Sequence, residues 1–186
     1  MSEQTRLNRK NGSYTLVAYD PKWVRKFEEL KDQLAPVFGN NLVSIDHIGS
    51  TSIPGMLAKP TIDVCVVVNS IKQVTAMRSD FESLGYIARG DYVGQGEEYF
   101  VLNDDKGKRK YNIHTVQKDN PAIEKYLSFR DYLRVYPKNA NHYREIKEKL
   151  LQEYGENDFN SYDYNKGDQI KDLQRAAIDW YRSKIN

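Results

Sequence analysis

Val43–Val68, VSIDHIGSTSIPGMLAKPTIDVCVVV, is the stretch of this sequence that decides the fold. It begins as an apolar run that ends in Gly49-Ser50-Thr51, continues through a connector broken by two prolines and a glycine, and closes with the most continuously apolar segment of the chain. Two β-like runs separated by a small, hydroxyl-rich turn indicate a sheet edge that presents backbone N–H groups and hydroxyls together. Such an edge suits an anionic group such as phosphate.

Asp63 is the single acid of the second apolar run and lies near its start. A binding site at this turn is one interpretation. The other is that Gly49 and Gly55 are ordinary turn residues and that Asp63 caps or pairs locally. The spacing alone leaves both interpretations open.

The length of 186 residues allows one domain with a substantial core. We therefore expect a polar tail at residues 1–13 and a single domain at residues 14–186. The single cysteine, Cys65, lies inside the apolar run and is predicted to be a core residue. One cysteine and three histidines provide no zinc-ligand spacing.

The composition argues for a cytoplasmic protein with no membrane partner. The N-terminus is polar, and no segment approaches the roughly 20 apolar residues of a membrane span. The net charge of +2 lacks the strong basic excess of a dedicated nucleic-acid binder, which argues against that partner. The sequence does not identify a protein partner.

Apolar periodicity predicts the remaining elements. We expect further strands at residues 14–18, 86–88, 98–102 and 111–116, a hairpin turn at 103–110, and helices at 21–35, 70–84, 121–137, from Asn139 or Asn141 to 154, and from 168 to the end of the chain. Residues 155–167 are predicted to form a polar, aromatic loop. In the strand at 111–116, alternation places Asn112 and His114 on the same face.

Arg130 and Arg134 are the most informative anomaly, because both fall within the apolar stripe of their helix. Two guanidinium groups on a core-facing side need carboxylates or a bound anion as partners. Alternatively, they extend past the apolar surface into water or pair with Asp131 and other local acids. Lys166 is predicted to precede the start of the last helix, where the helix dipole favours anions.

Five motifs together carry a resemblance to a known family. They are His47-Ile-Gly-Ser-Thr-Ser-Ile-Pro-Gly55, Ala58-Lys-Pro-Thr-Ile-Asp63, the Ile113-His114 strand, Tyr126-Leu-Ser-Phe-Arg-Asp-Tyr-Leu133 and Tyr162-Asp-Tyr-Asn-Lys166. The chain resembles the GrpB family, whose pattern includes H-x-G-S-T-S/A-V-P-G, K-P-x-I-D and F-R-D-x-L. The resemblance covers roughly residues 17–180.

The resemblance implies an α/β (α+β) architecture, the polymerase-β-like nucleotidyltransferase fold, with a mixed sheet, helices packed on it and a helical C-terminal third. It also implies that Gly49-Ser50 is a phosphate-binding signature and that Asp63 is an acid on the next strand. In a working nucleotidyltransferase, two carboxylates at D-x-D spacing and a third from a later strand hold Mg²⁺ ions. The flanking positions here are Thr61 and Cys65, so the carboxylate set is incomplete.

The family pattern H-x-H is Asn112-Ile-His114 in this chain, which removes one imidazole. The remaining His114 could bind one metal ion with Asp63, hydrogen-bond a phosphate, carry protons near neutral pH, or be a structural histidine.

Three functions are open at this point. The first is a nucleotidyl- or phosphoryl-transfer enzyme acting on a nucleotide or other phosphate-bearing small molecule. The second is a catalytically degenerate nucleotide- or phosphate-binding module that acts as a sensor or partner domain, which the incomplete carboxylate set favours. The third is an interaction protein that docks through the helix at residues 138–154.

The first hypothesis predicts a site with three kinds of residue. Gly49, Ser50 and Thr51 surround the phosphate, and Lys59, Arg130, Arg134 and Lys166 supply its counter-charges. Asp63 is the ligand of Mg²⁺ or another divalent cation, and His114 is the second metal ligand or the base.

Overall fold

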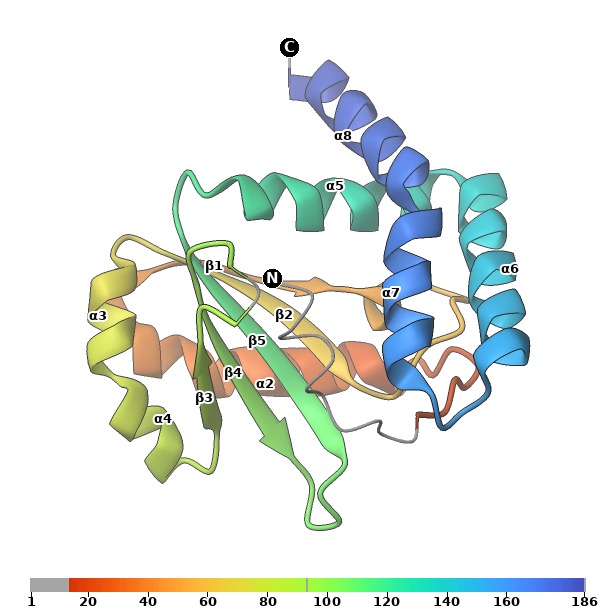
Figure 1. Cartoon of the computed structure of the whole chain (residues 1–186). Coiled ribbons are helices and arrows are strands. Elements are labelled where there is room, and N and C mark those ends of the chain that lie inside the picture. The colour runs from red at the N-terminus through yellow and green to blue at the C-terminus, as the bar shows by residue number, and fades with distance from the viewer. Residues whose placement is uncertain (1–13, 93, 186) are drawn as a thin grey trace.

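A five-stranded mixed sheet forms the centre of the molecule, as the computed structural model in Figure 1 shows for residues 14–92 and 94–185. The strands are β1 (Leu42–Ile48), β2 (Ile62–Val68), β3 (Ile87–Gly90), β4 (Glu97–Asn103) and β5 (Arg109–Gln117). Their spatial order is β1-β2-β5-β4-β3, with β2 and β5 parallel and the other neighbours antiparallel. The predicted tail at residues 1–13 lies outside the described residues.

Strand β5 lies between β2 and β4 (Figure 1). This order brings polar residues together on one face of the sheet. Asp63 of β2 is paired with Asn112 of β5, and His114 of β5 is paired with Tyr99 of β4. Directly paired residues point to the same side of a sheet, and residues two apart on a strand also share a side. These four side chains therefore lie on one face, as alternation predicted for Asn112 and His114.

The opposite face is apolar and is covered by α2 (Lys22–Phe38), α3 (Ile71–Ala76) and α4 (Arg78–Ser83). Helix α2 begins where the Asp20 carboxylate accepts a hydrogen bond from the Lys22 N–H, 2.9 Å away. Its inward stripe packs on the inward side chains of the strands. The buried core on this side includes Trp23, Phe27, Leu30, Leu34, Ile45, Val64, Val66, Val68, Phe81, Phe100 and Ile113.

Helix α5 (Pro121–Val135) packs on the polar face of the sheet and covers its apolar part. The Asn120 side chain accepts a hydrogen bond from the Ala122 N–H at 2.9 Å, which caps the helix at its predicted start. Ala122 and the half-buried Tyr126 pack with the β2 residues Cys65 and Val67. The rest of this face remains available for polar side chains.

The last third of the described chain is helical: α6 (Pro137–Tyr154), α7 (Phe159–Gln169) and α8 (Lys171–Ile185). Helices α6 and α7 lie side by side at one end of the sheet, and α8 continues upward past α5 (Figure 1). A second buried cluster joins these helices to the connector after β1. It contains Tyr14, Ile53, Met56, Leu133, Tyr143, Ile146, Leu150, Tyr162 and Ile170.

Four predicted elements differ from the structure. Residues 14–18 form only a single bridge between Val17 and Ala58 in place of a strand. Helix α2 continues through Pro36 to Phe38, and the helix predicted at 70–84 is divided into α3 and α4 at Met77. The loop predicted at 155–167 is wrong over most of its length, because α7 begins at Phe159 and buries Tyr162 in the second cluster.

The remaining predicted strands, the hairpin at 103–110 and the helices on either side of Pro137 are confirmed to within a few residues. Short 3₁₀ turns complete the fold, at Gly39–Asn41 before β1 and at Ser50–Ser52 (η2) after it. Within the described residues, no helix is long and apolar enough to cross a membrane.

Candidate functional site

Gly49 closes β1 and opens the turn that carries the predicted phosphate signature. Its backbone has φ +70° and ψ −176°, a conformation that glycine adopts and other residues avoid. The Asp63 carboxylate lies directly against it, so that a β-carbon at position 49 would be 2.4 Å from Asp63 Oδ2. Antiparallel pairing of Ile48 with Asp63 produces this approach. The turn and the acid predicted from sequence are therefore in contact.

Hydrogen bonds within the turn fix its shape. Ser52 donates to the Gly49 carbonyl oxygen twice, from its N–H at 3.2 Å and from its hydroxyl at 2.6 Å. The buried Thr51 hydroxyl donates to the Thr61 carbonyl oxygen at 3.3 Å and lies 3.0 Å from His47 Nε2. The Thr51 hydroxyl, predicted as a phosphate contact, is thus engaged with protein atoms in this structure.

His47 supports the turn from the apolar side of the sheet. Its ring stacks on Phe27, with centroids 4.8 Å apart. Because the Thr51 hydroxyl donates to a carbonyl, its contact with His47 requires a proton on Nε2. Burial, and then the charges of Arg134 and Arg130, lower the pKa of His47 to about 4. His47 is therefore a neutral hydrogen-bond donor at physiological pH.

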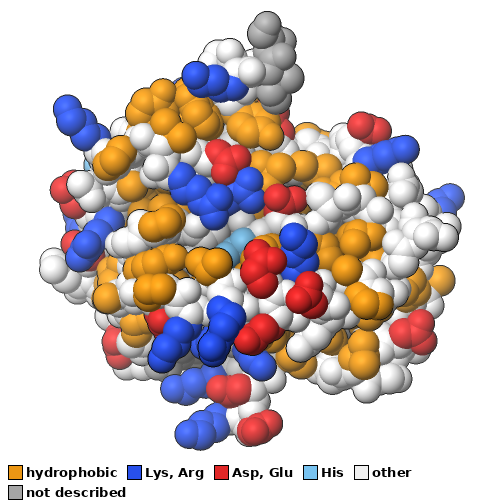
Figure 2. Space-filling view, turned by 180° about the vertical axis from the view of Figure 1, so that it is seen from behind, with side chains coloured by type: hydrophobic (Ala, Val, Ile, Leu, Met, Phe, Trp, Pro, Cys, Tyr) orange, Lys and Arg blue, Asp and Glu red, His pale blue; other side chains and the backbone are white. Residues whose placement is uncertain are grey.

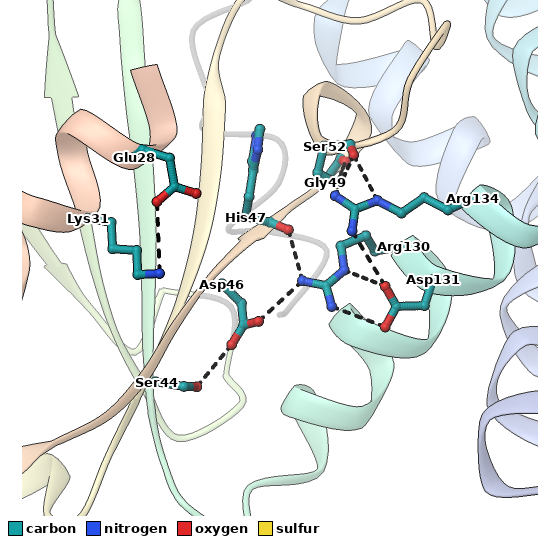
Figure 3. A network of polar contacts seen from close by, with 10 residues as sticks. All are labelled: Glu28, Lys31, Ser44, Asp46, His47, Gly49, Ser52, Arg130, Asp131 and Arg134. Carbon is teal, nitrogen blue, oxygen red and sulfur yellow. Dashed lines mark hydrogen bonds and ion pairs between the residues drawn. The ribbon is translucent and has the colours of Figure 1, made fainter. Parts of the chain in front are cut away.

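Arg130 joins α5 to the end of β1, as Figure 3 shows. Its Nε and NH2 donate to the two oxygens of Asp131 at 2.7 and 3.1 Å. Its NH1 donates to Asp46 Oδ1 at 3.3 Å and to the His47 carbonyl oxygen at 3.2 Å. The local acids thus provide the carboxylate partners that a guanidinium in this position needs.

Arg134 lies four residues after Arg130 on α5 and binds the Gly49–Ser52 turn (Figure 3). Its Nε and NH2 both donate to the Ser52 carbonyl oxygen, at 3.0 and 2.7 Å. Its NH1 lies 3.7 Å from Asp131 Oδ1. The donors of both arginines are therefore directed at protein acceptors, and the two side chains tie the Gly49–Ser52 turn to α5.

Lys147 of α6 faces the other side of the turn and was not singled out from the sequence. Only 2% of the residue is exposed, and its Nζ donates to Ser50 Oγ at 3.0 Å and to the Leu57 carbonyl oxygen. Tyr143, one turn earlier on α6, places its hydroxyl 3.4 Å from the same Ser50 Oγ. The predicted phosphate-signature serine thus has a buried ammonium group as its neighbour.

Two further lysines complete a group that we call the lysine cluster: Lys59, Lys147 and Lys166. Lys59 precedes β2, and its Nζ lies 3.8 Å from the centroid of the Phe159 ring. Lys166 of α7 pairs with Asp163 at 2.7 Å and is 21% exposed at its side chain. The cluster therefore draws one cation each from the connector, α6 and α7.

The electrostatics of the cluster favour an additional negative charge. Burial, followed by the charges of Lys166 and Lys59, lowers the pKa of Lys147 to about 7, and Asp63 opposes the shift. Burial, followed by the charge of Lys166, lowers the pKa of Lys59 to about 8. Burial opposes the charging of Lys166, but Asp163, Tyr143 and Tyr162 together outweigh it and raise the pKa of that lysine. Two of the three ammonium groups are therefore short of counter-charge.

Asp63 has a fixed orientation. Asn112 Nδ2 donates to Asp63 Oδ1 at 2.7 Å, while the Asn112 oxygen accepts from the Tyr99 hydroxyl at 2.8 Å and from Arg109 NH1 at 3.0 Å. The amide of Asn112 is thereby oriented with its nitrogen toward the acid. This leaves Oδ2 as the oxygen that faces Gly49.

The residues around Asp63 do not fit a two-metal centre. Thr61 donates its hydroxyl to the Arg109 carbonyl oxygen, and burial raises the pKa of the Cys65 thiol to about 12, so it remains protonated. The Asn112 oxygen already accepts two hydrogen bonds. Among the residues that the structure describes, no three His, Cys, Asp or Glu side chains come together to hold a metal ion. Metal binding by Asp63 and His114 stays a prediction.

His114 is paired with a buried acid that sequence reasoning did not identify. Its Nδ1 lies 3.0 Å from Glu97 Oε2, and the Glu97 side chain is fully buried. The ring stacks on Tyr99 at 4.7 Å and lies 5.4 Å from Tyr126. Burial, and then Glu97, raise the pKa of Tyr126. The register places this pair on the same face as Asp63, one step further along β5.

The structure corrects the predicted position of Lys166 and adds Lys147 to the site. Lys166 does not precede the last helix, as predicted, but lies in the last turn of α7, so the anion-favouring helix start is absent from its position. Lys147 could have been found from sequence, because it shares the apolar stripe of α6 with Tyr143 and Leu150. The reasoning that singled out Arg130 and Arg134 applies equally to this lysine.

Basic and acidic side chains are interleaved on the face of the molecule in Figure 2. Positive charge does not form a continuous patch on that face. In the β4–β5 hairpin, the exposed basic residues Lys106 and Lys108 have the exposed acids Asp104 and Asp105 as neighbours in the sequence. The concentration of cations around Ser50 is thus a local and largely buried feature.

Comparison with solved structures identifies the class of fold. The structure superposes on GrpB from Enterococcus faecalis with a TM-score of 0.83 and 34% identity, covering 90% of this chain and 99% of that one. The Cid1 poly(U) polymerase with MgGTP bound matches with a TM-score of 0.50 and 12% identity, covering 73% of this chain and 44% of that one. The chain thus has a nucleotidyltransferase-like fold.

The sequence comparisons give the family. The model of the GrpB protein family matches residues 13–176, so the chain belongs to the GrpB family. UPF0157 protein YqkA of Bacillus subtilis is 37% identical over 92% of this chain, which spans only 49% of that relative. A dephospho-CoA kinase of Mycolicibacterium paratuberculosis is 26% identical over 89% of this chain and 46% of its own length.

Proposed function

We propose that this chain binds a phosphate-bearing, nucleotide-like small molecule between the Gly49–Ser50 turn and the lysine cluster. The observation that carries the proposal is Lys147, an almost fully buried ammonium group 3.0 Å from Ser50 Oγ. An isolated buried cation is costly, and the usual outcomes are a lowered pKa or a bound anion. A phosphate at this position would supply the missing counter-charge.

The charge balance supports a polyanion over a single carboxylate. Lys166 is paired with Asp163, which together with Asp63 also acts on Lys59, whereas Asp63 is the acid that acts on Lys147. A phosphate carries about 1.5 to 2 negative charges near pH 7 and three strong acceptor oxygens. It could therefore accept hydrogen bonds from Ser50 and from more than one lysine at the same time.

Arg130, Arg134 and Thr51 have a different role in this proposal from the one expected from sequence. Their donors bind carboxylates and carbonyl oxygens of the protein. We assign them to positioning the turn, while Gly49, Ser50 and the lysines contact the ligand. Asp63 orients the site through Gly49 and Asn112, and no step is assigned to a metal ion.

Group transfer is the second candidate function. It is favoured by the Glu97–His114 pair, which lies on the same sheet face as Asp63 and is hydrogen-bonded as a proton-transferring pair would be. The nucleotidyltransferase-like fold accommodates such chemistry, but fold alone does not fix function. Release of pyrophosphate from a nucleoside triphosphate on addition of protein would support transfer.

Thermal unfolding in the presence of candidate ligands tests the proposal. The probes are inorganic phosphate, ATP, GTP, CTP, CoA and dephospho-CoA, each with and without Mg²⁺. CoA compounds are included because of the kinase relative. A ligand at 100 times its dissociation constant stabilises a protein by about 2.7 kcal/mol, which corresponds to roughly 5–11 °C for a chain of this size.

Matched variants locate the effect. Lys147→Met removes the buried cation, and Lys149→Met changes an exposed lysine of the same helix. We expect the ligand-induced shift in Lys149→Met and its loss in Lys147→Met. The absence of a shift with all six compounds in the wild-type protein would refute the proposal.

A further inference from the structure

Ser50 and Lys147 have the arrangement of a nucleophile and its base. Their side-chain atoms are 3.0 Å apart, within the roughly 2.6–3.2 Å that general-base activation requires. The Leu57 carbonyl oxygen accepts a second hydrogen bond from Lys147 Nζ. In a neutral amine, one hydrogen can remain on Leu57 while the lone pair accepts the Ser50 proton.

The surroundings of the amine favour its neutral form. Lys147 is 2% exposed, and the charged groups that act on it are Lys59 before β2, Asp63 on β2 and Lys166 on α7, with the Tyr143 hydroxyl nearby on its own helix. Burial and the two neighbouring lysines lower the pKa of Lys147 to about 7. The amine is thus partly unprotonated at neutral pH in the free protein. Because a bound phosphate raises this pKa, the base acts in those complexes in which the ligand has bound while the amine is neutral.

Ser50 is more accessible than its partner. Gly49 is exposed and Ser50 is half-buried at the end of β1, whereas Lys147 is enclosed. Part of Ser50 is therefore open to solvent, whereas the Lys147 amine is shielded from it. Tyr143 Oη, 3.4 Å from Ser50 Oγ, is placed to hydrogen-bond the oxygen before or after reaction.

We propose that Ser50 is a catalytic nucleophile and Lys147 its general base, forming a covalent bond between Ser50 Oγ and the phosphorus of a bound phosphate ester or anhydride. The inference rests on the proposed phosphate-binding function and adds a chemical step to it. Binding alone would require only that both groups donate hydrogen bonds to the phosphate.

The step balances without a co-reactant. The Ser50 Oγ–phosphorus bond forms, the bond from phosphorus to the leaving oxygen breaks, and the electron pair of that bond departs with the leaving group. The Ser50 proton passes to Lys147 Nζ. With a nucleoside triphosphate attacked at its α-phosphorus, the leaving group is pyrophosphate and the product is a nucleotidyl-serine. The charges of Lys59 and Lys166 already act on Lys147, and in this proposal they also neutralise the charge on the phosphoryl oxygens.

A fluorophosphonate probe tests the nucleophile directly. Attack by Ser50 forms an oxygen–phosphorus bond and expels fluoride, which leaves a stable adduct that intact mass and peptide mapping locate. We expect labelling of Ser50 in the wild-type protein, none at the exposed Ser79 and Ser183, and none at position 50 in Ser50→Ala. Labelling of Ser50 no faster than that of Ser79 would overturn the proposal.

The role of Lys147 has its own measurements. Lys147→Met should slow labelling about 100-fold or more, the usual contribution of a general base, while Lys149→Met should not. Because Lys147→Met could alter folding, the wild-type rate is also measured against pH. It should rise through about pH 7 as the amine loses its proton. A pH-independent rate, or an unchanged rate in a folded Lys147→Met protein, would overturn the assignment.

The two proposals fail separately. Thermal stabilisation by phosphate compounds without Ser50 labelling would retain the binding function and refute the nucleophile. Labelling of Ser50 without stabilisation by any phosphate compound would support the nucleophile and refute the binding function.

Discussion

Gly49 lies so close to Asp63 that a β-carbon at position 49 would be 2.4 Å from Oδ2. Gly49→Ala therefore combines a forbidden backbone conformation with a clash, and we expect it to lower the free energy of unfolding by about 2–5 kcal/mol. Chemical denaturation measures this loss. Gly55→Ala is the control, because φ there is +76° but no atom lies within 4 Å of the added carbon. Equal losses in the two variants would contradict the contact between Gly49 and Asp63.

The lysine cluster predicts how stability depends on pH. The pKa of Lys147 is lowered to about 7 and that of Lys59 to about 8, so above these values the unfolded chain holds more protons than the folded one. Stability must then rise with pH, by at most about 1.4 kcal/mol per pH unit for each lysine, between about pH 7 and the ordinary lysine pKa near 10.4. Denaturant titrations from pH 6 to 9 measure the slope. Lys147→Met should reduce it, and an identical slope in that variant would count against a buried, uncompensated Lys147.

Arg134 is predicted to stabilise the fold through the Ser52 carbonyl oxygen. Arg134→Met removes two charge-assisted hydrogen bonds to a buried acceptor and should cost about 1.5–3 kcal/mol of unfolding free energy. Arg144→Met removes an exposed ion pair with Glu148 and should cost about 0.5 kcal/mol or less. A loss for Arg134→Met as small as that for Arg144→Met would show that the turn does not depend on this contact.

Asp63→Asn tests the incomplete metal site. An asparagine at this position can still accept the hydrogen bond from Asn112 Nδ2, so the fold should persist. Because no group of metal ligands surrounds Asp63 in the described chain, we expect the Mg²⁺ dependence of ATP binding to be the same in the variant and the wild-type protein. Calorimetric titration at several Mg²⁺ concentrations measures it. Loss of the Mg²⁺ dependence only in Asp63→Asn would identify Asp63 as a metal ligand.

Local signals predicted much of the fold. The second apolar run of Val43–Val68 is β2, the glycine-serine turn follows β1, and the helix predicted from residue 121 is α5. These features depend on residues close in sequence, which periodicity and capping detect. The insertion of β5 between β2 and β4 depends on pairing over distances that a local pattern does not encode.

Helix α7 shows where local propensity is overridden. Its sequence, FNSYDYNKGDQ, is rich in residues typical of loops and contains a glycine. The helix forms because Asp158 accepts a hydrogen bond from the Ser161 N–H at 3.2 Å and because Tyr162 is buried against Tyr14, with ring centroids 4.7 Å apart. Tertiary packing of this kind is not visible in single-residue preferences.

The candidate site was predictable in part. The sequence identified Gly49 and Asp63. It could not show whether Arg130 and Arg134 bind carboxylates of the protein or a bound anion. Lys147 could have been identified by the same reasoning. The pairing of Glu97 with His114 could not be predicted without the strand register. Charged residues in apolar stripes thus located the site, and the sheet topology determined which of them meet.

Proton uptake on ligand binding is the most direct test of the lysine cluster as a phosphate site. A bound phosphate should raise the pKa of Lys147 from about 7, and that of Lys59 from about 8, toward ordinary lysine values. Calorimetric titration of ATP at pH 8, in buffers of different ionisation enthalpy, counts the protons. We predict net uptake by the wild-type protein and by Lys149→Met, and reduced uptake and affinity for Lys147→Met. ATP binding without proton uptake, or with equal uptake in Lys147→Met, would contradict the account.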